Sequence, residues 1–387
     1  MTWLLYAQLG VFGYFLYGFG PVVPLLRDEL GLSRTVAGLY GPALAVGAAV
    51  GGTVFPPLLR RVGAARTLWT GLAGISGGVA LLCLTASVPG TLACAALTMA
   101  FSVVLISAVP VALTSHHGLA GPASISEANA VAAAMGLVAP LLVGLSVTAG
   151  VGWRAGLAGA AVLAAVIGLA AWLLRIRIPN TATTSRPATG RLPYRYWVAW
   201  TCLLATGSVE VCLSLWASEQ LREQAGMTPG SAAAGMSAVL VGMVVGRTAG
   251  GGLMLRYGTV PLLLAAIATA GLGFGMFWLA TAPWLALTGL VVCGLGVALH
   301  FPLGLTLAIQ VSDGQPGLAV ARTSYGMALG FGAAPFALGA LADRVGISWA
   351  FLLVPCCLAV GAVTSWSLRR QADVAGASES TAAPTRA

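Results

Sequence analysis

Long apolar runs, separated by short breaks that contain charged residues, glycine or proline, dominate the pattern along this chain. A helix needs about 20 consecutive apolar residues to cross a bilayer, and most of the runs reach that length. The pattern therefore predicts twelve membrane-spanning helices. The expected spans are 3–26, 36–58, 66–87, 90–114, 127–150, 153–175, 194–218, 230–254, 259–280, 283–308, 318–341 and 347–368.

The composition supports a membrane protein and excludes a soluble one. Of 387 residues, 58% are hydrophobic and 7% are charged, and the mean hydropathy is +0.93. Soluble domains carry roughly 25% charged residues. The 52 glycines suit helices that pack closely in lipid, whereas an outer-membrane barrel shows shorter segments of alternating polarity. The expected fold class is an all-α integral membrane protein.

A polar stretch with prolines and a Thr/Ser cluster divides the spans into six plus six. We expect an N-terminal six-helix half at 1–175, a cytoplasmic linker at 176–193, a C-terminal six-helix half at 194–370 and a disordered cytoplasmic tail at 371–387. Most loop arginines lie on the side of the linker, which predicts a multi-pass protein of the cytoplasmic (inner) membrane with both termini in the cytoplasm. The first run lacks a basic start and an A-x-A site, so we expect no cleaved signal peptide.

An internal repeat relates the two halves. Leu221 lies 195 positions after Leu26, and several local patterns recur at the same offset, always between spans six apart. Because six is an even number, both halves share one orientation in the membrane, and such parallel repeats place a substrate site near the midplane between them. The matching pairs are Leu26–Ser33 with Leu221–Thr228, Arg61–Gly63 with Arg256–Gly258, and Ala139-Pro140 and Gly144 with Ala334-Pro335 and Gly339.

With this repeat and a basic loop at Leu59–Arg66, the chain resembles the major facilitator superfamily over about residues 3–370. The loop signature of that family is approximately G-x-L-x-D-R-x-G. The first copy has Pro56 at the glycine and Arg60 at the aspartate, and the second has Leu255 at the aspartate. The resemblance implies that both copies lack the acid of a charge relay that stabilises the outward-open form. A complete match, Gly339–Gly346, falls between the last two spans, either as a coincidental turn or because one span is miscounted.

Ionisable residues inside the predicted spans are the candidate functional residues. Each costs about 2.5–3.5 kcal/mol at the centre of a spanning helix, and three stand out: Glu210, Arg247 and His300. Glu127 and Arg322 begin spans 5 and 11 and are repeat mates. The resemblance implies that spans 1, 4, 7 and 10 line a central cavity, that spans 2, 5, 8 and 11 form the interface between halves, and that the rest face lipid.

Each candidate has a functional and a structural interpretation. Glu210 is expected to bind the coupling proton, or to hold two helices together as a structural acid. His300 could carry protons or bind substrate, or be a buried packing residue. Arg247 would bind a substrate anion, or pair with Glu127 across spans 5 and 8. Glu127 and Arg322 are interpreted as gate or interface charges near the cytoplasmic mouth.

Aromatic residues of the first span supply a possible cavity wall. Tyr14 and Tyr17 are three residues apart and share one helix face, so we expect them to contact substrate. Gln8 and Asn129 are polar candidates of the same kind, and Tyr6 lies on the same span.

Other classes of function find little support in the sequence. The seven cysteines lack metal-type spacing, and we expect no metal, no cofactor, no nucleic-acid partner and no catalytic residues. Gly74–Gly77 spells the G-x-S-G of rhomboid proteases, but it lies in a span expected to pack against lipid.

The resulting hypothesis is a secondary transporter, not an enzyme, whose partners are a small-molecule substrate, protons and the lipid bilayer, and which is monomeric. Within the superfamily it could resemble drug-efflux or cyanate-transporter branches. Proton-coupled efflux of a drug-like or small organic compound is preferred. Proton-linked uptake of a small organic anion is the alternative, and a non-transporting sensor on the same fold is a further one.

Overall fold

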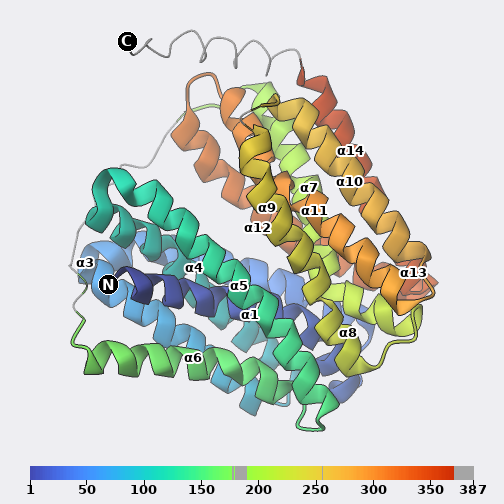
Figure 1. The fold of residues 1–387 in the computed structure, drawn as a ribbon, viewed down its shortest axis with the longest axis horizontal. Coiled ribbons are helices and arrows are strands. Elements are labelled where there is room, and N and C mark those ends of the chain that lie inside the picture. The colour runs from blue at the N-terminus through green and yellow to red at the C-terminus, as the bar shows by residue number, and fades with distance from the viewer. Residues whose placement is uncertain (177, 179–189, 255, 370–387) are drawn as a thin grey trace. The chain divides into compact units, whose positions relative to one another are not determined.

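The computed structural model describes residues 1–176, 178, 190–254 and 256–369, so most of the expected linker, Leu255 and the expected tail at 371–387 lie outside the described residues. The described residues contain helices and no strand (Figure 1). The helices are α1 (Thr2–Leu30), α2 (Arg34–Gly38), α3 (Tyr40–Leu84), α4 (Val88–His117), η1 (Gly118–Ala120), α5 (Gly121–Thr148), α6 (Trp153–Leu173), α7 (Tyr194–Glu223), α8 (Pro229–Gly235), α9 (Ser237–Met254), α10 (Thr259–Leu279), α11 (Pro283–Gln310), α12 (Pro316–Val345), α13 (Ile347–Ala350) and α14 (Leu353–Ser367).

Within the described residues, these helices make twelve membrane crossings, so the predicted number and the fold class are confirmed. Ten helical segments are long and apolar enough to cross a membrane. One of them, Arg34–Leu84, is 51 residues long and contains two crossings, because its helix is interrupted at Gly63. The remaining crossing is α12, which is 30 residues long.

The break at Gly63 separates the second and third crossings. Its backbone has φ 77° and ψ 171°, a conformation that residues with a Cβ rarely adopt. Helical structure continues on both sides, so the chain reverses direction with very little loop. Three arginines, Arg60, Arg61 and Arg66, are exposed around this turn. The basic loop predicted from the sequence is therefore a tight turn between two helices.

By contact density the described chain forms two compact units that only partly follow the two halves of the repeat. Unit 1 contains the N-terminal six-helix half together with 214–237 and 335–347, which are the end of α7, all of α8 and the end of α12. Unit 2 contains 186–213, 238–334 and 348–387.

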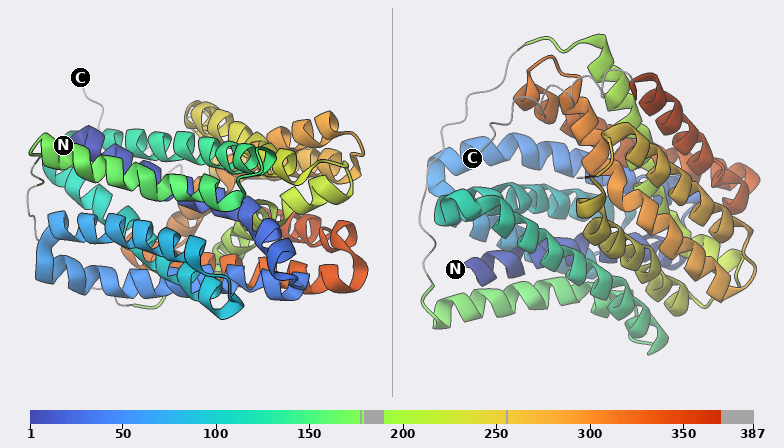
Figure 2. Two further views of the ribbon diagram at one scale, coloured as in Figure 1. Left: turned by 90° about the horizontal axis from the view of Figure 1, so that it is seen from below. Right: turned by 45° about the horizontal axis from the view of Figure 1, so that its top comes forward.

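In unit 1 the helices pack through small residues. The ribbons of α1 and α5 run side by side (Figure 2), and a Cβ placed on Gly13 would lie 2.1 Å from the backbone oxygen of Ala132. The backbones of α1 and α5 therefore touch, as expected where helices associate in lipid. Large side chains such as Phe15 and Phe19 fill the remaining core and are almost fully buried.

In unit 2 the same type of packing joins α9, α10 and α11. A Cβ on Gly294 of α11 would lie 2.1 Å from the backbone oxygen of Val239 in α9. Phe274, Phe277 and Phe351 form an aromatic cluster between α10 and the turn before α14. Both units therefore have close-packed interiors.

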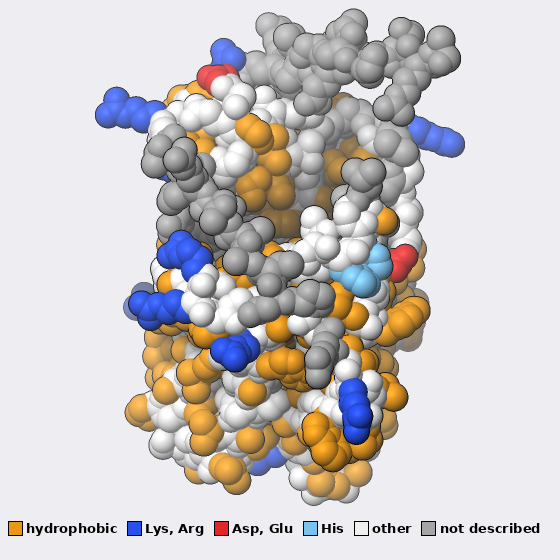
Figure 3. Space-filling model, turned by 90° about the vertical axis from the view of Figure 1, so that its left-hand side faces the viewer, with side chains coloured by type: hydrophobic (Ala, Val, Ile, Leu, Met, Phe, Trp, Pro, Cys, Tyr) orange, Lys and Arg blue, Asp and Glu red, His pale blue; other side chains and the backbone are white. Residues whose placement is uncertain are grey.

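The surface is mostly apolar or uncharged, as a bilayer requires. In the face shown in Figure 3, hydrophobic and uncharged side chains predominate and charged ones are few. Large hydrophobic residues are exposed on many helices, among them Leu84, Trp172 and Val363. On a soluble protein such an extent of exposed apolar surface would be an association site. Here it fits a multi-pass membrane protein.

Candidate functional site

A group of charged side chains gathers where α1 and α7 end and α2 begins. We call it the distal charge cluster, because it lies at the ends of the helices opposite the N-terminus of α1. All its members belong to unit 1. They come from both halves of the repeat, which unit 1 brings into contact at this end. The cluster consists of Arg27, Asp28, Arg34, Glu219, Arg222 and Glu223.

Glu219 is the centre of the distal charge cluster. Its side chain on α7 is 1% exposed, and its Oε1 accepts hydrogen bonds from Arg27 Nη1 and from Arg34 Nε, the latter at 2.6 Å. Its Oε2 is buried and has no hydrogen-bond partner among the described residues. A carboxylate so deeply buried is tolerated only when it is paired. Here one carboxylate binds two guanidinium groups from the other half of the repeat.

More exposed ion pairs surround this centre. Arg222 Nη1 lies 2.6 Å from Asp28 Oδ2, and Arg34 also pairs with Glu223. Arg27 additionally pairs with Asp28 at 2.9 Å. The pairs cross between repeat mates, since Arg27-Asp28 corresponds to Arg222-Glu223 in the sequence. The repeated motif thus binds its own copy.

Next to this cluster, Asp343 at the end of α12 caps the N-terminus of α2. Asp343 Oδ1 accepts a hydrogen bond from the Arg34 backbone N–H at 2.8 Å, and Oδ2 accepts from Thr35 N–H and Thr35 Oγ1 at 2.7 and 2.6 Å. Partial burial raises the pKa of Asp343, but these hydrogen bonds outweigh it, and the pKa lies below its ordinary value. A carboxylate at a helix N-terminus is favoured by the free N–H groups and by the helix dipole.

Tight packing seats the end of α12 at this position. Trp216 Nε1 of α7 donates to the backbone oxygen of Pro335 at 2.9 Å. A Cβ on Gly339 would lie 2.5 Å from the Arg34 backbone oxygen and 2.7 Å from Trp216 Cζ2. A glycine at 339 therefore allows α12 to approach both α2 and α7. The signature match at Gly339–Gly346 therefore lies where α12 closely contacts α2 and α7, in a chain that has the twelve crossings expected from the sequence.

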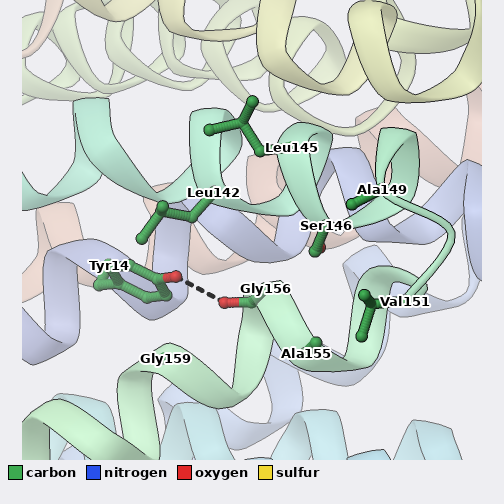
Figure 4. A pocket seen from close by; sticks show the side chains of 9 residues that line it. All are labelled: Tyr14, Leu142, Leu145, Ser146, Ala149, Val151, Ala155, Gly156 and Gly159. Carbon is green, nitrogen blue, oxygen red and sulfur yellow. Dashed lines mark hydrogen bonds between the residues drawn. The ribbon is translucent and has the colours of Figure 1, made fainter.

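The expected aromatic wall lies inside unit 1. Tyr14 is fully buried, and its Oη donates to the Gly156 backbone oxygen of α6 at 2.5 Å (Figure 4). It lines an apolar cavity of about 370 Å³ between α5 and α6, with Leu142, Leu145 and Ser146 among its neighbours (Figure 4). Tyr17 is half-buried and packs against Gly136 of α5. The two tyrosines thus meet different neighbours, although they lie three residues apart on one helix.

At the opposite end of α1, Glu127 is exposed on α5 and accepts a hydrogen bond from Tyr6 Oη at 2.6 Å. Asn129 is exposed, and its side chain donates to the Ile125 backbone oxygen. Gln8 is fully buried, and its amide has no hydrogen-bond partner among the described residues.

The remaining candidates lie in unit 2. His300 on α11 is 2% exposed, packed inside the unit. Glu210 on α7 is half-buried, and Arg247 on α9 is exposed. The Arg322 guanidinium on α12 lies 5.8 Å from the centre of the Trp197 ring. Glu210, Arg247 and His300 therefore come from three different helices of unit 2.

Residues 199–386 match the family model "Major Facilitator Superfamily". Over 96–97% of its length the chain has the fold of solved transporters. This is the major facilitator fold. The resemblance seen in the sequence is therefore confirmed at the level of the fold, and the family model supports it over residues 199–386.

Three solved structures illustrate the likeness. A bacterial homologue of the human lysosomal transporter Spinster, inward-facing and unoccupied, is 15% identical with a TM-score of 0.69, covering 97% of this chain and 93% of that one. A variant of the nucleoside transporter NupG is 12% identical with a TM-score of 0.75, covering 96% and 98%. The transporter FucP in the outward conformation is 16% identical with a TM-score of 0.59, covering 96% and 98%. At these identities the likeness shows the fold alone, and no curated protein matches the chain in sequence.

Sequence reasoning missed the distal charge cluster of this chain. Arg27, Arg34 and Arg222 lie just outside the expected spans, and Glu219 at the end of a long apolar run was not singled out. One signal was available: the repeat places Arg-Asp at the end of the first span and Arg-Glu at the end of the seventh. Two copies of a charged motif on helices related by the repeat axis are candidates for pairing with each other.

Proposed function

We propose that this protein is a secondary transporter that moves a small molecule across the cytoplasmic membrane by alternating access, coupled to protons. The observation that carries the proposal is the distal charge cluster. It joins α1 and α2 of the first half to α7 of the second through charged pairs that can break and reform. In this proposal both termini are cytoplasmic, the distal side is extracytoplasmic, and the cluster is its gate.

Efflux of a drug-like or small organic compound is the preferred direction. Glu210 on α7 is proposed as the proton-binding carboxylate, with His300 as a second proton carrier or a substrate ligand. Tyr14 and Tyr17 are proposed to contact substrate. Tyr14 is enclosed by α1, α5 and α6 here, so its contact with substrate requires a rearrangement. Glu127 and Arg322 are proposed as charges of the opposite, cytoplasmic gate.

Uptake of a small organic anion is the second candidate, favoured by one observation. Arg247 is an exposed arginine on a span expected to line the interface between halves, and glycines 246 and 250 flank it. An arginine keeps its charge at any physiological pH, so it can provide a fixed site for a carboxylate or similar anion. In that case a proton would accompany the substrate inward.

Ligand binding to the purified protein distinguishes these candidates. A ligand that binds the folded form raises the melting temperature. The panel is a set of small organic anions and lipophilic cations at pH 5.5 and 7.5, with Arg247→Ala and Glu210→Gln as variants. Stabilisation by anions that disappears in Arg247→Ala supports uptake, whereas stabilisation by lipophilic cations that disappears in Glu210→Gln supports efflux.

Transport itself is measured in proteoliposomes with an imposed pH gradient and the ligands that stabilise the protein. Accumulation or loss of ligand that follows the gradient supports proton coupling. Unchanged pH-driven transport in Glu210→Gln would overturn the role of that residue. Ligand binding without any movement across the membrane would instead identify a sensor.

A further inference from the structure

The only complete copy of the family's loop signature in this chain stands on the distal side. Arg60 occupies the aspartate position in the first cytoplasmic copy and Leu255 in the second. Asp343 occupies it in Gly339–Gly346, at the turn between α12 and α13. The acid that the two other loops lack is therefore present at one place, and the structure shows what it contacts there.

The contacts of Asp343 join the two halves of the repeat. Asp343 belongs to the C-terminal half, whereas Arg34 and Thr35 begin the second crossing of the N-terminal half. Both carboxylate oxygens are used, with three donors at 2.6 to 2.8 Å. Separating the two halves on this side would therefore remove every one of these hydrogen bonds at once.

We propose that Asp343 is a positioning residue that holds the distal side of the transporter closed. It does so by capping α2 only in the closed arrangement, so the chain favours the conformation whose substrate site is open to the other side. This inference rests on the proposed alternating-access function. It assigns the signature in this chain to the distal side, next to the distal charge cluster.

Two further contacts of this region do not involve Asp343. Ser33 Oγ already accepts a hydrogen bond from the Val36 N–H at 3.2 Å, so α2 keeps its own N-cap when Asp343 is removed. The Arg34 side chain is bound to Glu219 and Glu223 rather than to Asp343. Loss of the Asp343 carboxylate therefore removes the hydrogen bonds between α12 and α2 while leaving their packing contact and the charge cluster in place.

The experiment measures the open-to-closed ratio of the distal side directly. The full-length protein, with its seven native cysteines replaced, carries spin labels at Val151→Cys and Thr281→Cys and is reconstituted in lipid nanodiscs. Both positions are exposed in turns, between α5 and α6 and between α10 and α11, which the chain topology puts on the distal side. Electron–electron double resonance then gives the distance distribution. Asp313→Ala is the matched control, because Asp313 is an exposed aspartate just before the other end of α12.

We expect Asp343→Ala to raise the ratio of long to short distances about fivefold, the change that corresponds to loss of one helix cap. Asp343→Asn, which keeps one acceptor oxygen, should fall between, and Asp313→Ala should match the wild type. Distances in Asp343→Ala equal to those of wild type would overturn the inference. If that variant does not purify, Asp343→Asn decides by the same comparison.

The measurement needs no substrate, so it separates this inference from the proposed function. Transport with unchanged distances in the Asp343 variants refutes the role of Asp343 and leaves the transporter intact. A shift in distances in a protein that moves none of the tested ligands supports the cap and counts against the proposed transport.

Discussion

Replacing Glu219 by glutamine tests the distal charge cluster at its centre. The substitution keeps the shape of the side chain and removes its charge, so the Arg27 and Arg34 guanidinium groups lose their shared buried partner. Each retains an acidic neighbour, Asp28 or Glu223. The loss is therefore smaller than the 3–5 kcal/mol, roughly, of a buried charge left without any partner.

The size of the effect follows from the two hydrogen bonds that Glu219 accepts. A hydrogen bond to a charged group contributes about 1.5–3 kcal/mol, and a neutral amide oxygen retains part of each. We expect a net loss of about 2–3 kcal/mol from the closed distal arrangement. At 1.4 kcal/mol for each factor of ten, the open-to-closed ratio should rise roughly 30- to 150-fold.

The spin-label pair at positions 151 and 281 measures this ratio, with Glu223→Gln as the matched control. Glu223 belongs to the same cluster but its side chain is 44% exposed, and an exposed ion pair contributes about 1 kcal/mol or less. We therefore expect the control to shift the ratio less than about tenfold. Equal shifts in the two variants, or no shift in Glu219→Gln, would refute the idea that burial makes Glu219 the centre of the gate.

Two further predictions concern pH and packing. The pKa of Asp343 is lowered in the closed arrangement, so its contribution to the stability of that arrangement is fully present above its ordinary pKa and is lost only as the pH falls through the lowered value. The distances between the spin labels at positions 151 and 281 should therefore show no change that depends on Asp343 between pH 7.5 and 5.5. Such a change in that pH range would contradict the role of Asp343. Gly13→Ala should lower the melting temperature, since its Cβ meets the backbone of Ala132 and overpacking costs about 1–3 kcal/mol. The control Gly52→Ala in α3, where a Cβ meets nothing within 4 Å, should leave the melting temperature unchanged or raise it. Equal melting temperatures of the two variants would show that the packing of α1 on α5 does not depend on this contact.

The number of crossings could be predicted from sequence because hydrophobic length alone determines it. Span boundaries at Gly63 and at the α12–α13 turn followed from glycines and charges in the sequence. The partners of the charged residues could not be predicted. Glu127 was expected as a gate or interface charge, or as a partner of Arg247, and nothing in the sequence indicated the hydrogen bond that it accepts from Tyr6.

Glu219 was missed for a related reason. Its importance depends on burial, and burial at the end of a span depends on which side chains of a distant segment cover it. Arg27 and Arg34 lie about 190 positions earlier in the chain, and only the fold brings them to Glu219. For Asp343 the sequence supplied the motif, whereas its contact with α2 required the structure.

The division of the chain into units has a mechanical consequence for α12. This helix is continuous, yet 316–334 belongs to one unit and 335–345 to the other. Any movement of one unit against the other must bend it at that point. Residue 335 is a proline, which has no amide hydrogen and weakens the helix there. The same boundary passes between α8 and α9, where the chain already breaks into two helices, but crosses α7 without a proline. We therefore expect any such bending to concentrate at residue 335 of α12, at the base of the segment that carries the Asp343 cap.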